Sequence, residues 1–319
     1  MSEPSPPTPT VAVDKWIGVV AGVVAPTTVI TGLCYYFGFV SARAYFAYFG
    51  IDTESFEYST ADYVLRSVSV LYPALVVLLA VGCGLFAIRA YGRRALHQGR
   101  GSRFAHRAGW AGLVAGALLT ALAVLGVVAP GVSVLRSTVL IPVALAVGAL
   151  LIVAGSGALA ALRSGDSPRS ATSAERSIWL FAGAAIVLAL FWLTNIFATD
   201  YGQQQAKNTA GDLWDKETVV VLDTTEPLFA PSNLVQETPL GTQPGQRFTY
   251  RYECLRTLVV RPDRWVLVPA RWTVENGYAL IVPIDDSSRI SLTKLDGLAD
   301  NKEATNWDAT WQCPEVAPF

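Results

Sequence analysis

The side chains that most often carry catalysis are scarce in this chain and lie far apart. Its two histidines, His97 and His106, lie nine positions apart in an arginine-rich segment, with no acid or thiol nearby. Residues 200–319 contain no histidine, which excludes a Ser-His-Asp triad or a histidine-based metal site there.

Oxygen ligands for a hard cation are the next candidate, at Asp285, Asp286 and Ser287. One short acidic turn lacks the ligand number and spacing of a recognisable calcium loop. Asp and Ser also favour such turns because they hydrogen-bond their own backbone. Other carboxylates leave an acid pair for glycoside hydrolysis open, but no spacing singles one out. We therefore predict no catalytic residue, no cofactor and no metal site.

The four cysteines fall into two groups. Cys34 and Cys83 lie in uncharged stretches, where a thiol usually acts as a small apolar group. Cys254 and Cys313 lie in the last 120 residues and form no CxxC pair. If this part of the chain lies in an oxidising compartment, they are expected to form one disulfide.

Long uncharged stretches dominate the first 200 residues. A helix needs about 20 apolar residues to cross a bilayer, because hydrocarbon cannot hydrogen-bond a bare backbone. Five stretches without an Asp, Glu, Lys, Arg or His meet this length: Trp16–Ala42, Ser67–Ile88, Ala108–Leu135, Ser137–Leu162 and Ser177–Thr199. They predict five transmembrane helices. The absence of ionisable groups inside them disfavours an ion-coupled carrier.

Arginines predict the orientation. The segment 89–107 has six arginines and no acid: Arg89, Arg93, Arg94, Arg100, Arg103 and Arg107. Positive charge accumulates on the cytoplasmic side, so this segment is expected inside and residues 200–319 outside. The same arginines could instead contact anionic lipid or a cytoplasmic partner, although topology alone explains them.

Residues 200–319 have a different pattern. A polar helix is expected at 200–216. Strands are expected at 218–223, 247–261, 265–270, 278–284 and 289–295. With 11 basic and 17 acidic residues, this part is acidic, which argues against a nucleic-acid partner.

Aromatic residues cluster after the first predicted span, at Tyr45, Phe46, Tyr48 and Phe49. The interpretation favoured by the sequence is an aromatic belt at the membrane interface. The alternative is a lateral binding groove formed with residues 200–319. Ser59 and Asp62 have the spacing of a capping box at the start of the second span.

Three segments carry a resemblance: YYFGFVSARAYFAYFGIDTESFEYSTADYVLRS (35–67), FATDYG (197–202) and YRYECLRTLVVRPDRWVLVPARWT (250–273). They resemble a group of uncharacterised multi-pass membrane proteins of high-GC actinobacteria. The likeness runs from residue 16 to about residue 295. It implies a plasma-membrane location and this number of spans, but no functional residue.

The predicted fold is an α-helical membrane bundle of five transmembrane helices plus a small extracytoplasmic domain. That domain is expected to be all-β or α+β, an antiparallel meander or barrel. The expected parts are a disordered cytoplasmic tail (1–15), the membrane domain (16–199), and the extracytoplasmic domain with its juxtamembrane helix (200–319).

The function expected first is that of a non-enzymatic integral membrane protein. Its extracytoplasmic β domain would bind a protein partner or an envelope component, and small residues in the spans would permit a homo-oligomer. The alternative is a subunit of a transporter or channel. The third possibility is an extracytoplasmic enzyme, which the absence of histidine from residues 200–319 disfavours.

Overall fold

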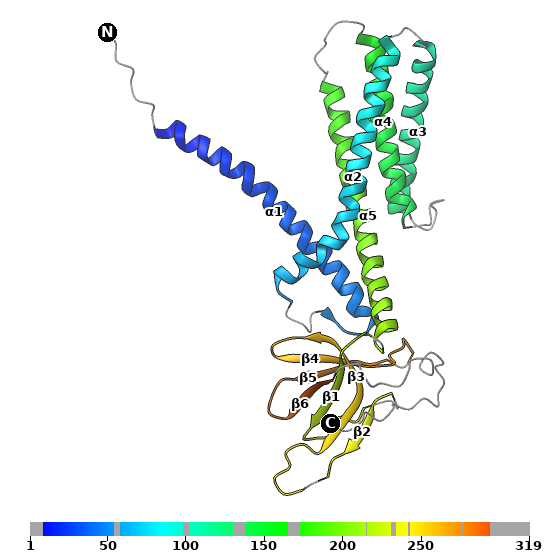
Figure 1. Cartoon of the computed structure of the whole chain (residues 1–319). Helices are drawn as coiled ribbons and strands as arrows, with labels where there is room; N and C mark the ends of the chain where they lie inside the picture. Colours follow the sequence, from blue (N-terminus) through cyan, green and yellow to red (C-terminus); the bar gives the residue numbers. More distant parts are fainter. Residues whose placement is uncertain are drawn as a thin grey trace, which may run out of the picture. The chain divides into compact units, whose positions relative to one another are not determined.

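A computed structural model describes residues 9–53, 58–97, 102–129, 138–164, 173–214, 216–230, 234–241, 243–275 and 277–293. The described chain forms five helices followed by an antiparallel sheet of six strands (Figure 1). The helices are α1 (Pro9–Tyr48), α2 (Thr60–His97), α3 (Ser102–Val128), α4 (Leu140–Ser164) and α5 (Ser173–Asp212). The expected change from a helical first part to a β-rich second part is confirmed.

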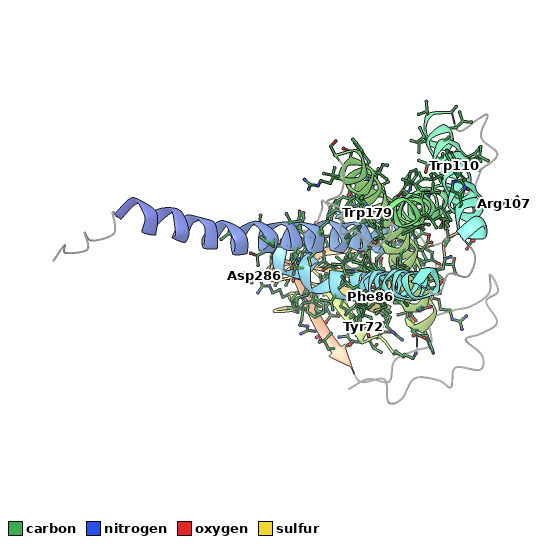
Figure 2. The ribbon with its side chains drawn as sticks, turned by 90° about the horizontal axis from the view of Figure 1, so that it is seen from above. Tyr72, Phe86, Arg107, Trp110, Trp179 and Asp286 are labelled. Atoms are coloured by element: carbon green, nitrogen blue, oxygen red, sulfur yellow. The ribbon has the colours of Figure 1, made fainter. Side chains whose placement is uncertain are left out.

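Among the described residues, four helices are long and apolar enough to cross a membrane, over Thr60–Gly84, His106–Val128, Leu140–Ala160 and Arg176–Asp212. Many large apolar side chains of these helices are exposed. Tyr72 and Phe86 of α2, which are among the exposed side chains, are labelled in Figure 2. Such a surface suits hydrocarbon, which is as apolar as these side chains. α1 contains the first predicted span but begins at Pro9, so residues 9–15, which were expected to be disordered, are helical.

Local sequence explains where α1 ends and α2 begins. At the end of α1, Gly50 has φ +73°, and Gly50 N donates to Ala47 O while Ile51 N donates to Phe46 O. This pair of bonds is a Schellman motif, which needs a residue that tolerates the left-handed region. Ser59 and Asp62 cap α2 reciprocally, because Asp62 N donates to Ser59 Oγ and Ser59 N donates to Asp62 Oδ2. The predicted capping box is therefore confirmed.

Glycines bring α3 and α4 side by side (Figure 1). A Cβ atom on Gly148 would lie 3.0 Å from Gly116 O, and one on Gly155 would lie 2.7 Å from Gly109 O. Backbone atoms of the two helices therefore approach so closely that a side chain has no room. Close approach of this kind lets van der Waals contacts hold helices together where no hydrophobic driving force exists.

We expect Gly155→Val to separate α3 from α4 and to destabilise the protein by roughly 1–3 kcal/mol, as overpacked interiors do. Gly157→Val is the matched control, because it lies on the same helix and a Cβ there meets nothing within 4 Å. Thermal unfolding of the detergent-solubilised protein, followed by helical circular dichroism, measures the difference. Equal losses in the two variants would show that helix propensity, and not packing, sets the effect.

The strands are β1 (Val219–Thr224), β2 (Gln236–Pro239), β3 (Tyr250–Val260), β4 (Arg264–Pro269), β5 (Leu280–Pro283) and β6 (Ser288–Thr293). Their order is β5-β4-β3-β1-β6, with β2 also paired to β3, and every pair is antiparallel. β3, β4 and β5 form the expected meander. The expectation that all strands pair in chain order, as in a meander, is wrong for β1, which lies between β3 and β6.

β1 is an interior strand, between β3 and β6, and all six of its residues are buried. A strand covered on both faces is a run of apolar residues without alternation, and Val219–Leu222 has that pattern. One face contributes Val220 and Leu222 to a core with Tyr252, Leu255 and Leu267. The other face carries Val219, Val221 and Asp223.

The chain divides into two compact units. The helical unit comprises Met1–Ser41 and Ser59–Thr199. The sheet unit comprises Ala42–Tyr58 and Asp200–Phe319, and so includes the ends of α1 and α5 as well as the strands. The segment after the first predicted span therefore folds with the β-rich part of the chain.

Candidate functional site: the junction within the sheet unit

An aromatic cluster joins the end of α1 to the loop after β4. The ring centroids of Tyr48 and Phe49 lie 5.2 Å and 4.8 Å from that of Trp272. Phe49 also lies 5.5 Å from Tyr45, whose hydroxyl donates to Thr209 Oγ1 on α5 at 3.4 Å. Aromatic pairs at these distances add about 0.5–1.5 kcal/mol each beyond the area they bury.

The same segment makes a second contact through Tyr58. Its ring centroid lies 5.6 Å from that of Phe46, and the guanidinium of Arg261 lies 4.0 Å above it. Tyr45, Phe46 and Phe49 are buried within the sheet unit. The interface-belt interpretation is therefore wrong for these three residues, which form part of a protein core instead.

A buried arginine fastens the C-terminal end of α5 to β3. Arg256 is only 1% exposed, and its Nε donates to Leu213 O at 2.9 Å. Nη1 and Nη2 donate to the carbonyls of Leu255 and Trp214 at 3.1 and 3.4 Å. Carbonyls just past a helix end carry partial negative charge, so a cation is a suitable donor to them. We call Arg256, Trp214 and these carbonyls the arginine clamp.

Two guanidinium groups lie close to the ring of Trp214. Arg256 and Arg271 lie 5.2 Å and 5.9 Å from its ring centroid. Arg271 is also buried, and burial lowers the pKa of its guanidinium. The indole face supplies electron density that partly offsets the cost of taking both cations out of water.

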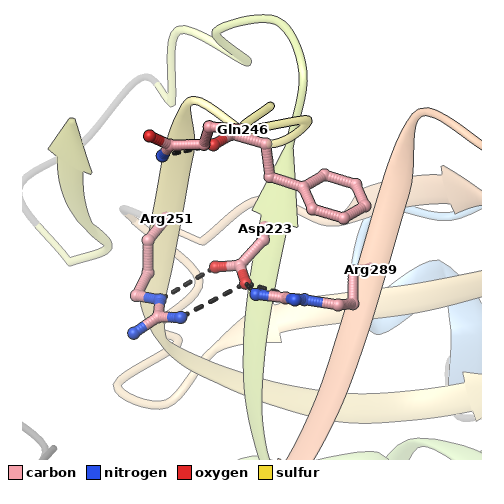
Figure 3. A network of polar contacts seen from close by, with 5 residues as sticks. Asp223, Gln246, Arg251 and Arg289 are labelled. Carbon is pink, nitrogen blue, oxygen red and sulfur yellow. Dashed lines mark hydrogen bonds and ion pairs between the residues drawn. The ribbon is translucent and has the colours of Figure 1, made fainter. Parts of the chain in front are cut away.

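A charged network occupies the Asp223 face of the sheet. Asp223 is 1% exposed, and its carboxylate accepts hydrogen bonds from Nε and Nη2 of both Arg251 and Arg289 (Figure 3). Burial by itself raises the pKa of this carboxyl, but the bonds from Arg251 and Arg289 outweigh it and hold the pKa below its usual range. Asp223 is therefore a buried anion held between two cations.

The lowered pKa predicts an acid-sensitive contribution to stability. A carboxyl with a depressed folded-state pKa stabilises the fold above its unfolded pKa, about 3.9, and loses that contribution as the pH falls through the folded value. We expect the melting temperature of Asp223→Asn to depend less on pH below about pH 4 than that of the wild type. Thermal unfolding across this pH range measures both slopes.

The control for this measurement is Asp286→Asn. That carboxylate is 96% exposed and pairs with Arg247 on the surface, where an ion pair contributes little. Its melting curve should keep the wild-type pH dependence. An unchanged slope in Asp223→Asn would contradict the role given to the network.

The sequence-predicted arginines lie at the facing ends of α2 and α3. Arg89, Arg93 and Arg94 belong to the last turns of α2, and Arg103 and Arg107 to the first turns of α3. Of their side chains, only that of Arg107 is among the described residues, and it is exposed. Arg100 lies outside the described residues, so contact with lipid or a partner stays a prediction.

The acidic turn Asp285–Ser287 behaves as its residue types predict. Asp285 Oδ1 accepts hydrogen bonds from Ser287 N, at 2.8 Å, and from Ser287 Oγ. The bonds from Ser287 lower the pKa of the Asp285 carboxyl. Among the described residues, no group of three or more His, Cys, Asp or Glu side chains is arranged to hold a metal ion.

Cys254 occupies an unusual backbone position. It lies in a bulge between β1 and β3, has φ +62°, and packs with Trp214 and Ala270. Cys34 and Cys83 are free thiols. Cys254 is not free, but its predicted partner, Cys313, lies outside the described residues.

The Cys254–Cys313 bond therefore stays a prediction. It would close a loop of about 60 residues and stabilise the fold by roughly 4 kcal/mol in the chain-entropy model. Mass spectrometry of the purified, unreduced protein should find the two cysteine peptides linked. Alkylation of both thiols without reductant would contradict it.

Comparisons with known proteins found no relative of this chain. No protein-family model, curated protein or solved structure matches the chain. The resemblance to actinobacterial membrane proteins accordingly stays a prediction.

Proposed function

We propose that this chain is a non-enzymatic integral membrane protein that presents an extracytoplasmic β domain to a protein partner or an envelope component. The observation that supports it most is that the sheet unit is built from two segments that lie far apart in the sequence. The aromatic cluster and the contact of Tyr45 with Thr209 join residues 42–58 to residues 200–319. Residues 42–58 precede α2, and residues 200–319 begin in the polar last turns of α5, so in sequence they flank the apolar stretches of the four described helices that could cross a membrane.

An even number of spans returns the chain to the side from which it started. Segments on either side of four spans can therefore fold together, whereas three or five spans would separate them. The six arginines of segment 89–107 favour the cytoplasm for the opposite side. On this proposal, the sheet unit lies outside the cell whether or not α1 crosses the membrane.

Site-specific photo-crosslinking in intact cells tests the binding role. We would place p-benzoylphenylalanine at Phe229, Val274 and Leu292, three exposed positions on different parts of the sheet unit. Phe86 of α2 is the control, because it is a comparably exposed apolar side chain that lies in the predicted span Ser67–Ile88. We expect a discrete adduct from at least one sheet-unit position that is absent from the control.

No adduct from any of these positions would count against a presented binding domain. Solute flux or conductance in liposomes that contain only this chain would then favour the transporter or channel alternative. Turnover of an envelope substrate by the purified protein would favour an enzyme.

A further inference from the structure

Two arginines share one carboxylate across three neighbouring strands. Asp223 of β1 is opposite Arg251 of β3 on one side and Arg289 of β6 on the other. The three side chains thus form one row on the sheet face. Asp223 by itself neutralises only one of the two guanidinium groups, and Glu253, which also acts on Arg251, is a further carboxylate nearby.

Each arginine donates to Asp223 through one edge of its guanidinium, the edge that carries Nε and Nη2. Nε and Nη2 of both arginines face the carboxylate (Figure 3), and no described acceptor is bonded to either Nη1. The two side chains remain accessible, with Arg251 34% and Arg289 54% exposed. Their remaining N–H groups are therefore available to a ligand in solvent.

Neighbouring residues hold Arg289 in place. The guanidinium of Arg289 lies 5.0 Å from the ring centroid of Phe248, and Gln246 Nε2 donates to Phe248 O at 2.8 Å. Gln246 also closes its own turn by accepting from Gln243 N. A guanidinium fixed by a carboxylate and a ring loses little freedom on binding, which favours affinity.

We propose that Arg251 and Arg289 form a binding site for a phosphate group, either on a soluble phosphorylated molecule or on a lipid headgroup. Guanidinium groups suit this ligand because their planar donors match phosphate oxygens in pairs. The proposal deepens the proposed function by naming the ligand chemistry, and it rests on the sheet unit facing outward. The carboxylate of Glu253 interacts electrostatically with Arg251 and would repel an anionic ligand.

Tripolyphosphate binding to the full chain in a non-ionic detergent tests the site by isothermal titration calorimetry. We expect Arg289→Gln to raise the Kd about tenfold, the loss of one charge-assisted hydrogen-bonding pair. Arg247→Gln is the matched control, because it removes the same charge from an exposed arginine paired with Asp286. We expect Glu253→Gln to lower the Kd, since it removes the opposing carboxylate.

A second arm separates the two sources of phosphate. The protein in phosphatidylcholine nanodiscs is mixed with vesicles that contain phosphatidylglycerol, and co-flotation is measured. Wild-type co-flotation that Arg289→Gln weakens, without tripolyphosphate binding, assigns the site to a lipid headgroup. Arg289→Lys, which keeps the charge, guards against misfolding and should retain part of the binding.

The proposal fails if the wild type binds neither probe, or if Arg289→Gln and Arg247→Gln weaken binding equally. This failure is distinguishable from failure of the proposed function. Photo-crosslinking can still identify a partner when phosphate does not bind. Phosphate binding without a crosslinked partner would support the phosphate site and count against a protein partner.

Discussion

Replacing Arg256 with methionine should destabilise the sheet unit by about 3–5 kcal/mol, because several buried carbonyls lose their donor at once and each unsatisfied group costs about 1–3 kcal/mol. The carbonyls concerned are those of Leu213, Trp214 and Leu255. Methionine restores only the apolar stem of arginine, so the loss reports the missing guanidinium with its hydrogen bonds and charge. A change of this size is comparable with the whole stability of a small domain.

Two further variants make the Arg256 measurement specific. Arg256→Lys keeps the charge but offers one ammonium in place of the guanidinium fork, so an intermediate loss is expected. Arg264→Met is the control, since Arg264 is partly exposed and pairs with the adjacent Asp263. Denaturant unfolding of the full chain, followed by tryptophan fluorescence, compares them. A loss in Arg256→Met no greater than in Arg264→Met would contradict the arginine clamp.

Trp272→Ala should also cost about 3–5 kcal/mol, as large-to-small changes of a buried aromatic do. Trp272 is 6% exposed and supports both Tyr48 and Phe49 of the aromatic cluster. Its loss should loosen residues 42–58 from the strands and expose them to protease. Limited proteolysis of the full chain, with the cleavage sites mapped by mass spectrometry, measures this effect.

Trp272→Phe is the matched variant for the aromatic cluster. It keeps a ring beside Tyr48 and Phe49 and removes a buried indole N–H that has no acceptor among the described residues. We expect a much smaller loss than in the alanine variant. Equal cleavage between residues 42 and 58 in both variants would show that the cluster does not hold this segment.

The helices and most strands were predictable because their signals are local. Uncharged runs of more than 20 residues predict spans, and the apolar run of β1 predicts a buried strand. β2 was missed because Gln236–Pro239 is polar and ends in a proline, which is typical of a turn or an edge. Its only described pairing is with β3.

The junction could not be predicted, because its partners are remote in sequence. Four aromatics after a span are typical of an interface belt, and only the fold brings Trp272 to Phe49. The sequence does hold one signal in LRTLVV, where Arg256 interrupts an apolar strand. A charge at such a position must find buried partners, which here are the carbonyls beyond α5.

The Asp223 network could be predicted only in part. Asp223, Arg251 and Arg289 lie in predicted strands, but their alignment depends on β1 lying between β3 and β6. A sequential meander would not have placed both arginines beside one carboxylate. Strand order is set by non-local pairing, and the local pattern of each strand does not determine it.

Cysteine-accessibility labelling of Ala47→Cys and Thr218→Cys in intact cells tests the central claim most directly. Both positions are exposed and lie in the two segments of the sheet unit that flank the four apolar helices. The background carries Cys34→Ala and Cys83→Ala, and His106→Cys at the start of α3 is the opposite-side control. We expect a membrane-impermeant maleimide to label positions 47 and 218 in intact cells, and position 106 only after permeabilisation. Labelling of positions 47 and 218 from opposite sides would contradict a single sheet unit, and labelling of both only after permeabilisation would contradict its place outside the cell.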